Sequence, residues 1–198
     1  MAAAALGIAA AGEGTLPGDV EIARLVQRPV SPTLDTLARQ MSIIGDDFPG
    51  MVVLALLGVV ILISRGRRDL ALFLALAAAL RAIGPGLKVL INSPRPTLET
   101  VVIVAQANGL GFPSGHAMGA ALFYGAIAVI APQAIRDRAP ARGVQWLAAV
   151  MMILIALARV RLGVHWPSDV VGGLLFGLAI VCGLWAGMVA WQQRGRER

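Results

Sequence analysis

The chain has 198 residues, of which 58% are hydrophobic and only 14% are charged, and its mean hydropathy is +0.77. About a quarter of the residues in a soluble domain are charged, so this composition excludes an ordinary soluble domain and predicts several membrane spans. The formal net charge of +6 does not indicate a nucleic-acid partner, because the basic residues form no continuous patch with interleaved aromatics. The single cysteine, Cys182, lies in an apolar run and cannot form an intrachain disulfide.

The N-terminal segment begins with a short apolar stretch. Met1–Ala11 is too short for a span and has no basic residue before it, so we expect neither a signal peptide nor a span there. Ser31-Pro32 is typical of a helix start. Apolar residues then recur at helical spacing: Leu34, Leu37, Ala38, Met41 and Ile44. This pattern predicts an amphipathic helix that lies in the membrane interface or packs against the bundle, and the sequence leaves both open.

Five later segments are apolar and long enough to cross a bilayer. They are Phe48–Ser64, Asp69–Ile91, Ser114–Ala131, Val144–Leu162 and Pro167–Trp191. The first is close to the lower length limit, and Gly84-Pro85-Gly86 should kink or unwind the second near its far end. The expected fold is therefore all-α, a polytopic transmembrane bundle of five spans (residues 48–198) preceded by an N-terminal segment with the interfacial helix (residues 1–47).

Charge is distributed unevenly between the two ends of these spans. Three connections are basic and would share one side, with Arg65, Arg67 and Arg68, then Arg136, Arg138 and Arg142, then Arg194, Arg196 and Arg198. Residues 1–47 carry six acidic residues against three arginines. The positive-inside rule therefore predicts that the N-terminus lies outside and the C-terminus in the cytoplasm. We expect Trp146, Trp166 and Trp191 to form aromatic belts at the two interfaces.

The outward ends of the spans carry the unusual polar residues, in three groups. Lys88 near the end of span two is followed seven residues later by Arg95, between two prolines. Cations beside a membrane often only snorkel to the interface, but the rigid Pro-Arg-Pro frame favours a fixed position. Ser114-Gly115-His116 begins span three, where free N–H groups can bind an anion; the alternative is a simple helix cap.

The third group is Arg159, His165 and Asp169. Four residues separate His165 from Asp169, so the carboxylate can accept a hydrogen bond from the imidazole and leave the other ring nitrogen nucleophilic. The alternative to such a pair is that Asp169 is an ordinary acidic residue at a helix start and that His165 is an aromatic residue at the membrane interface. Taken together, the cations can neutralise a phosphoryl group, while one histidine attacks phosphorus and the other protonates the leaving oxygen. We expect no metal site, because His, Cys, Asp and Glu do not cluster at ligand spacing.

These residues closely resemble the three-part signature of the type 2 phosphatidic acid phosphatase (PAP2) superfamily of membrane lipid phosphatases. The signature K-x6-R-P, P-S-G-H and S-R-x5-H-x3-D is matched at Lys88–Pro96, Pro113–His116 and Ala158–Asp169. The departure is Ala158, where the family usually has serine, and it puts one phosphate-contacting hydroxyl in doubt.

The resemblance implies a role for each matched position. His165 would be the nucleophile, Asp169 its orienting partner and His116 the general acid. The phosphate would be bound by Lys88, Arg95, Ser114, Gly115 and Arg159. Neither a metal nor another cofactor would be needed. The spacing alone does not decide between the two histidines.

A lipid phosphate or diphosphate that enters the bundle from the side is the expected substrate, at an inner membrane of bacterial type. A polyprenyl (undecaprenyl) diphosphate is the leading candidate. Phosphatidylglycerophosphate, phosphatidic acid and decaprenyl-phosphoribose compete with it, as does a lipid phosphotransferase that uses the same site; a lipid-phosphate transporter is a further alternative. We expect a monomer or a weak homo-oligomer.

Two features fall outside the signature. Arg81 lies within span two, roughly on the face of Lys88, and either has a function or meets a structural partner inside the bundle. Glycines four residues apart predict close helix contacts within the monomer. They are Gly115/Gly119, Gly173/Gly177 and Gly183/Gly187.

Overall fold

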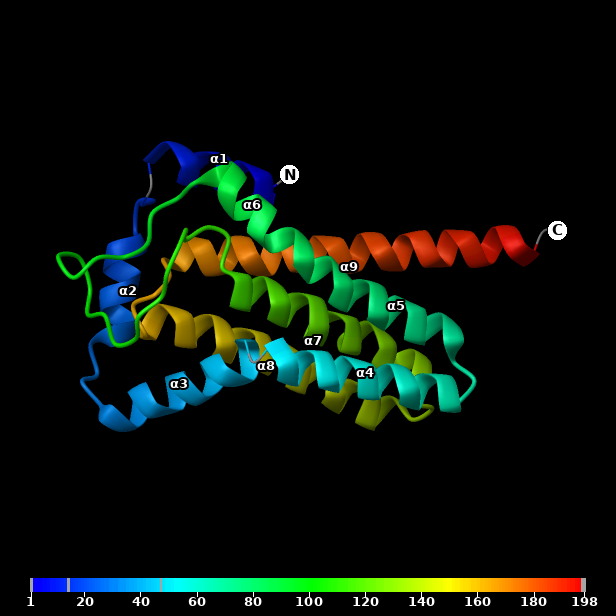
Figure 1. Cartoon of the computed structure of the whole chain (residues 1–198). Coiled ribbons are helices and arrows are strands. Elements are labelled where there is room, and N and C mark those ends of the chain that lie inside the picture. Colours follow the sequence, from blue (N-terminus) through cyan, green and yellow to red (C-terminus); the bar gives the residue numbers. More distant parts are fainter. Residues whose placement is uncertain (1, 14, 47, 197–198) are drawn as a thin grey trace.

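The computed structural model describes residues 2–13, 15–46 and 48–196, and it is built from helices (Figure 1). The helices are α1 (Ala2–Glu13), α2 (Asp19–Gln27), α3 (Pro32–Asp46), α4 (Phe48–Ser64), α5 (Arg68–Ala79), the 3-10 turn η1 (Leu80–Ile83), α6 (Gly84–Ile91), α7 (Gly115–Ala134), α8 (Arg138–Arg161) and α9 (Pro167–Arg196). The predicted all-α fold is confirmed.

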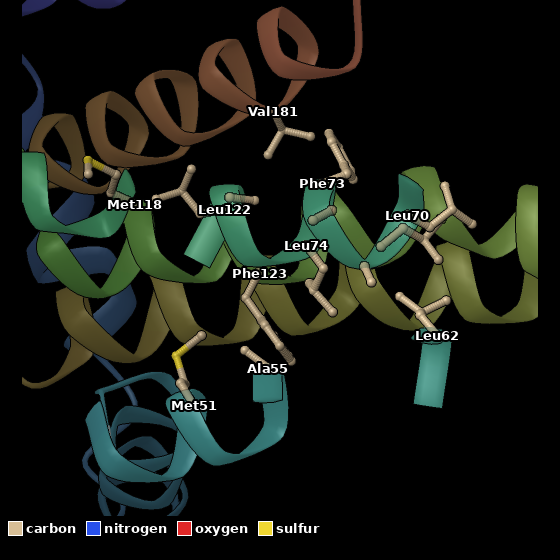
Figure 2. Close-up of a cluster of buried hydrophobic side chains, with 14 residues drawn as sticks. Met51, Ala55, Leu62, Leu70, Phe73, Leu74, Met118, Leu122, Phe123 and Val181 are labelled. Atoms are coloured by element: carbon tan, nitrogen blue, oxygen red, sulfur yellow. The ribbon is translucent and has the colours of Figure 1, made fainter. Parts of the chain in front are cut away.

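Helix α7 is the centre of the bundle, and α5, α8 and α9 run alongside it (Figure 1). Its apolar side chains are buried, and they join those of α4, α5 and α9 in the largest core cluster, in which Phe73, Leu74, Met118 and Leu122 meet (Figure 2). Gly173 and Gly177 allow α9 to approach α7 closely. A Cβ atom at Gly177 would lie 2.5 Å from Ala121 Cβ and 2.7 Å from Met118 O.

Four helical segments are long and apolar enough to cross a membrane by themselves: 68–91, 115–134, 138–161 and 167–195. The predicted first span corresponds to α4, and it reaches the required length only when it is counted together with α3, as a pair bent by 51°.

The break in the second span lies next to Gly84-Pro85-Gly86, as expected. Helix α5 ends at Ala79 and continues as the 3-10 turn η1 before α6 begins with Pro85 in its first turn. Because proline has no N–H, it cannot donate to the carbonyl of Arg81, which instead accepts from Gly84 N. The proline therefore changes the hydrogen-bond pattern of one turn, and the span continues beyond it.

The three basic connections lie at the same end of the bundle (Figure 1). The α4–α5 turn, the α7–α8 turn and the end of α9 are together there, and the long 92–114 loop is at the other end. The fold therefore places the three basic connections on one side of the bundle, as the charge pattern requires. Asp47, Glu197 and Arg198, which contribute to that pattern, lie outside the described residues.

The predicted amphipathic helix is α3, and Ser31 begins it as expected, since its Oγ accepts a hydrogen bond from Leu34 N at 3.3 Å. One face of α3 packs against α8: Ala38 is buried, and a Cβ atom at Gly45 would lie 2.6 Å from Ile155. Leu37 on its other side is exposed. The helix thus packs against the bundle, which was one of the two alternatives.

The sequence analysis missed α2, a short helix that crosses the end of the bundle (Figure 1). Its first residue, Asp19, is buried and accepts hydrogen bonds from Ser168 N and Ser168 Oγ at 2.8 and 2.7 Å. Its last turn is held by Arg161 of α8, which donates to Val26 O at 3.0 Å. Helix α2 therefore caps the start of α9.

Trp166 corrects one expectation. A belt residue would be exposed at the interface, as Trp146 and Trp191 are at 73% and 70%, but Trp166 is only 2% exposed. It packs in a cluster with Ala23 of α2. The prediction for Trp166 was wrong because α2 covers this part of the bundle end.

Candidate active site

The three polar groups meet at the end of the bundle opposite the basic connections. A cavity of about 820 Å³ is lined by six of the eight predicted residues: Lys88, Arg95, Gly115, His116, Arg159 and His165. Lys88 comes from α6, His116 from the first turn of α7 and Arg159 from the last turn of α8. Segments 71 residues apart in sequence, from Lys88 to Arg159, thus contribute to one site.

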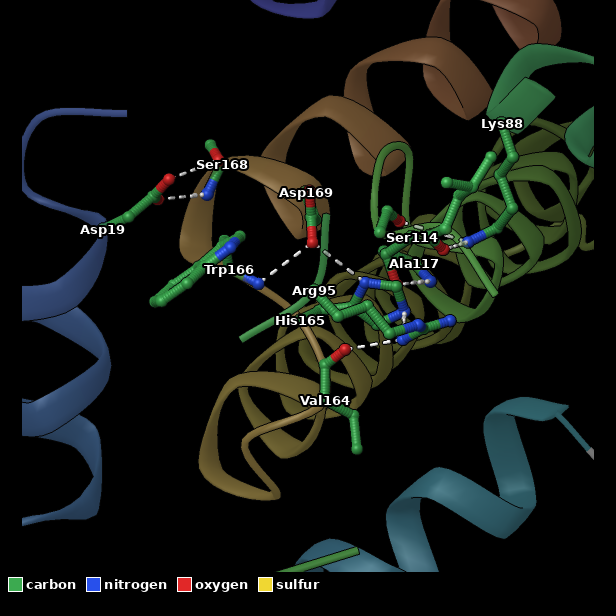
Figure 3. A network of polar contacts seen from close by, with 12 residues as sticks. Asp19, Lys88, Arg95, Ser114, Ala117, Val164, His165, Trp166, Ser168 and Asp169 are labelled. Atoms are coloured by element: carbon green, nitrogen blue, oxygen red, sulfur yellow. Dashed lines mark hydrogen bonds and ion pairs between the residues drawn. The ribbon is translucent and has the colours of Figure 1, made fainter. Parts of the chain in front are cut away.

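His165 and Asp169 form the pair that their spacing predicted (Figure 3). His165 Nδ1 lies 3.0 Å from Asp169 Oδ2, and this oxygen also accepts from Trp166 N at 3.0 Å. Both side chains are 1% exposed. A carboxylate at Nδ1 favours the tautomer with the proton on that nitrogen, which leaves Nε2 with its lone pair available.

The electrostatic surroundings keep the His165 ring neutral. Burial, followed by the charges of Arg95, Lys88, Arg159 and His116, lowers the pKa of His165 well below 6.5. A neutral imidazole is the form that can attack an electrophile, so the surroundings favour its nucleophilic state at pH 7.

Arg95 lies directly at the reactive nitrogen of His165 (Figure 3). Its Nη1 is 3.1 Å from His165 Nε2 and donates to Val164 O at 2.6 Å, and its Nε donates to Gly109 O at 3.0 Å. Burial lowers the pKa of the Arg95 guanidinium, and Asp169 opposes this effect; arginine remains charged in proteins all the same. An anion that reaches Nε2 would therefore meet a guanidinium there.

Lys88 is anchored on the other wall of the cavity by the 92–114 loop. Its Nζ donates to Leu110 O at 2.7 Å and to Gly111 O at 3.1 Å. Gly111 has no room for a side chain, because a Cβ atom would lie 2.9 Å from Pro94 O and 3.0 Å from Asp169 Oδ2. This close packing fixes the loop between the lysine and the histidine–aspartate pair.

Ser114, a predicted phosphate ligand, does not line the cavity itself. It is fully buried, and its Oγ accepts a hydrogen bond from Ala117 N at 3.5 Å as the cap of α7. Its own N–H donates to Asp169 O at 2.9 Å. Ser114 thus joins the start of α7 to the start of α9, while Gly115 beside it lines the cavity.

Sequence reasoning missed Ser42 of α3. Its Oγ accepts a short hydrogen bond from Arg159 Nη1 and lies 3.4 Å from His116 Nε2. Ser42 is four residues after Ala38, on the face that packs against α8, and it lines the cavity together with Arg39. The helical spacing of α3 places Ser42 on the apolar face, but only the fold brings that face to the two signature residues.

A second cavity, of about 730 Å³, opens beside the first, between α4 and the α5–α6 segment. Its walls are largely apolar: Val52, Ala55, Leu56, Val59, Ala75, Ala78, Ala79, Ala82, Pro85 and Met118. Lys88 and Gly115 line both cavities. An apolar groove and the cationic pocket thus share two lining residues, an arrangement suited to an amphiphile with an anionic head.

The chemistry available at the site is nucleophilic attack by one imidazole within a group of cations. No cluster of three or more His, Cys, Asp and Glu side chains that could hold a metal ion occurs in the part of the chain that the structure describes. Metal independence stays a prediction.

Residues 68–193, which include every signature position, match the PAP2 superfamily. The chain belongs to the PAP2 superfamily. It is 33% identical over 187 residues to the decaprenylphosphoryl-5-phosphoribose phosphatase of Mycobacterium tuberculosis, with 91% of this chain and 96% of the relative covered. An undecaprenyl-diphosphatase of Sulfolobus acidocaldarius is 25% identical over 171 residues, with 84% of this chain and 76% of the relative covered.

The fold of this PAP2 protein is also found in a crystal structure. A transmembrane PAP2-type phosphatidylglycerolphosphate phosphatase from Bacillus subtilis superimposes with a TM-score of 0.76 at 24% identity, and the match covers 97% of this chain and 92% of the other. The membrane-spanning bundle, the family and its phosphatase relatives identify this chain as an integral-membrane lipid phosphatase.

Proposed function

We propose that this PAP2 protein removes the terminal phosphate of a membrane lipid through a phosphohistidine at His165. The observation that carries the proposal is the buried His165–Asp169 pair, whose second ring nitrogen faces the cationic pocket. His165 Nε2 would attack phosphorus while the bond to the leaving oxygen breaks, and His116 would protonate that oxygen. Water would then attack the phosphohistidine, releasing inorganic phosphate and restoring the imidazole.

Lys88, Arg95 and Arg159 would neutralise the charge on the phosphoryl oxygens during both steps. Catalysis of phosphoryl transfer depends mainly on positioning and on such charge neutralisation. Arg95 supports this role by its 3.1 Å contact with His165 Nε2, because the guanidinium lies beside the nitrogen that would attack phosphorus and can bind the phosphoryl oxygens there. Gly115 would let the first N–H groups of α7 approach the phosphate.

The hydrocarbon tail would occupy the groove between α4 and the α5–α6 segment. This proposal is supported by Lys88 and Gly115, which line both the groove and the phosphate pocket. A polyprenyl diphosphate was the leading candidate from the sequence and is still a prediction. The similarity over 96% of a decaprenylphosphoryl-5-phosphoribose phosphatase supports a lipid-linked phosphosugar as a second candidate.

We also propose that the pocket faces the outside of the cell, with the N-terminus outside and the C-terminus in the cytoplasm. The shared end of the three basic connections supports this orientation. The state of assembly, monomer or weak homo-oligomer, stays a prediction.

The test is phosphate release from a panel of lipid phosphates by purified protein in detergent, with chelator present. We expect release by the wild type and none by His165→Ala. Acid-quenched protein should carry label from a 32P-labelled substrate, with the acid lability of a phosphohistidine. Full activity of His165→Ala would contradict the mechanism. Label that passes to an added lipid or sugar alcohol in place of water would indicate the phosphotransferase.

A further inference from the structure

The first turn of α9 carries Asp169, and α9 does not complete the cap of this turn by itself. The helix begins at Pro167, so Trp166 occupies the N-cap position and Asp169 is the third residue of the helix. Asp169 Oδ2 accepts a hydrogen bond from Trp166 N at 3.0 Å, which is one half of a capping box. The other half is a side-chain oxygen at the N-cap that accepts from the second or third N–H of the helix. Tryptophan has no such oxygen, so the acceptor must come from elsewhere.

Asp19 of α2 supplies the acceptor (Figure 3). Its Oδ1 accepts from Ser168 N, the second N–H of α9, at 2.8 Å, and its Oδ2 accepts from Ser168 Oγ at 2.7 Å. Asp19 is only 3% exposed, and its Oδ2 also accepts from Leu16 N at 2.9 Å. A carboxylate at the start of a helix is further stabilised by the helix dipole. The cap of α9 is thus completed by a side chain 149 positions away in sequence.

The position of this turn sets the geometry of the histidine–aspartate pair. Asp169 directly follows Ser168, so a shift of the Ser168 main chain moves the carboxylate that lies 3.0 Å from His165 Nδ1. The turn has a second attachment, because Ser114 N donates to Asp169 O at 2.9 Å. His165 is held from a different direction, by Arg95 Nη1 at 3.1 Å from its Nε2. A shift of the first turn of α9 would therefore change the distance within the pair, since Arg95 does not move with α9.

We propose that Asp19 is a positioning residue for the proposed nucleophile: by capping α9 it holds Asp169 where this carboxylate keeps the proton of His165 on Nδ1. The inference rests on the proposed function, in which His165 Nε2 attacks phosphorus. Without the cap, the carboxylate would be misaligned, and a share of the His165 rings would carry the proton on Nε2. Such rings have no lone pair with which to attack. Asp19 lies outside residues 68–193, so this support comes from a part of the chain that the family match does not cover.

The experiment compares Asp19→Ala and Asp19→Asn with two control variants of α2, Glu21→Ala and Arg24→Ala. Glu21 is an exposed acidic residue two positions after Asp19. Arg24 Nε donates to Thr100 O at 2.8 Å, so its loss weakens the attachment of α2 to the 92–114 loop. Phosphate release from dioleoyl phosphatidylglycerophosphate, dioleoyl phosphatidic acid and farnesyl diphosphate gives kcat and KM. The assays are done in detergent, below the unfolding temperature of each variant.

We expect Asp19→Ala to lower kcat about tenfold or more, because a small misplacement of a catalytic group is costly, and to change KM less than about twofold, because the phosphate-binding cations keep their places. Asp19→Asn keeps one acceptor oxygen for Ser168 N and should show a smaller loss in the same direction. Glu21→Ala and Arg24→Ala should keep the wild-type kcat. In a His116→Gln background, 15N NMR should detect His165 rings with the proton on Nε2 when Asp19→Ala is added, and not before.

A folded Asp19→Ala protein with the wild-type kcat and the wild-type His165 tautomer would overturn the inference and leave the proposed function standing. A loss of kcat that Arg24→Ala shares would also overturn it, because α2 would then have only a general structural role. If Asp19→Ala does not fold, Asp19→Asn decides by the same two measurements. Activity of His165→Ala, or no release from any of the three lipids by the wild type, would instead contradict the proposed function.

Discussion

The two histidines of the pocket differ in what surrounds their ring nitrogens, and this difference is measurable. His165 is buried against Asp169 with three cations near it, which lowers its pKa well below 6.5. At pH values between the pKa of His165 in the folded protein and about 6.5, this histidine is protonated in the unfolded chain but not in the folded protein. The free energy of unfolding therefore decreases as the pH falls below about 6.5. Since the chain has only two histidines, 15N NMR of histidine-labelled protein in detergent can follow both.

We expect one ring to stay neutral, with its proton on Nδ1, at pH values where an ordinary histidine is already charged. In His116→Gln this should be the signal that remains. A His165 that takes up its proton at pH 6.5 or above would contradict the proposed nucleophile, because at neutral pH a large fraction of its rings would then be unable to attack.

Asp169 orients His165, and its effect should be on the rate constant. Asp169→Asn would present an amide in place of a carboxylate and permit the wrong ring tautomer, so we expect kcat to fall by about 10³-fold or more, as in comparable catalytic pairs. The thermal unfolding temperature in detergent, measured in parallel, controls for a loss of fold. Retention of a tenth of the wild-type kcat by a folded variant would contradict the orienting role.

Ser42 is predicted to position His116 and Arg159, which it contacts from α3. Ser42→Ala should lower kcat about tenfold, the effect of one lost hydrogen bond to a charged group, and it should shift the pH profile because the surroundings of His116 change. Ser42→Thr keeps the hydroxyl and should recover part of the rate. The matched control is Thr36→Ala on the same helix, since Thr36 Oγ1 bonds only to Pro32 O in the described network; a similar loss there would point to helix packing.

At this scale the sequence predicted the signature residues well and their neighbours poorly. The i, i+4 spacing correctly placed Asp169 at His165, because both belong to one short turn. Ser42 is 74 residues from His116, and only the packing of α3 against α8 brings the two together. For Ser114 the sequence left cap or ligand open, since the same residue suits both.

At the scale of helices, the glycines of α9 allow a direct comparison. Gly177 faces α7 with no room for a Cβ atom, whereas a Cβ atom on Gly183 would meet nothing within 4 Å. Gly177→Ala should lower the free energy of unfolding by about 1–3 kcal/mol through overpacking. Gly183→Ala should be neutral or slightly stabilising, because alanine favours the helix. Thermal unfolding in detergent checks both, and equal effects would contradict this account of the α7–α9 contact.

Hydropathy predicted the spans because each span is a long, continuous run of apolar residues, which is visible in the sequence without knowledge of the fold. The sequence analysis missed α2, although Val20, Ala23 and Val26 recur at helical spacing and pack in one cluster. Its nine residues are short for a helix that is stable by itself, and contacts of Asp19 and Arg161 hold it in place. Trp166 was misplaced for the same reason: its burial depends on a helix more than a hundred residues away in sequence.

At the scale of the whole molecule, the pocket and the basic connections lie at opposite ends of the bundle. If the basic end is cytoplasmic, every phosphate is released outside and every lipid must present its head group there. This orientation can be tested with single cysteines in a Cys182→Ser background. The two variants are Asn108→Cys and Arg65→Cys. Asn108 lies in the wall of the pocket, and Arg65 lies in an exposed turn at the other end of the bundle.

In intact cells, a membrane-impermeant maleimide should label Asn108→Cys and leave Arg65→Cys unlabelled, because the bilayer separates the reagent from the cytoplasmic turn. Permeabilised cells should label both, which controls for the accessibility of each thiol. The Cys182→Ser parent should stay unlabelled in either case, and phosphate release by each variant shows that the bundle is intact. The reverse pattern in intact cells would place the pocket on the cytoplasmic side, and the lipid would then have to present its head group in the cytoplasmic leaflet.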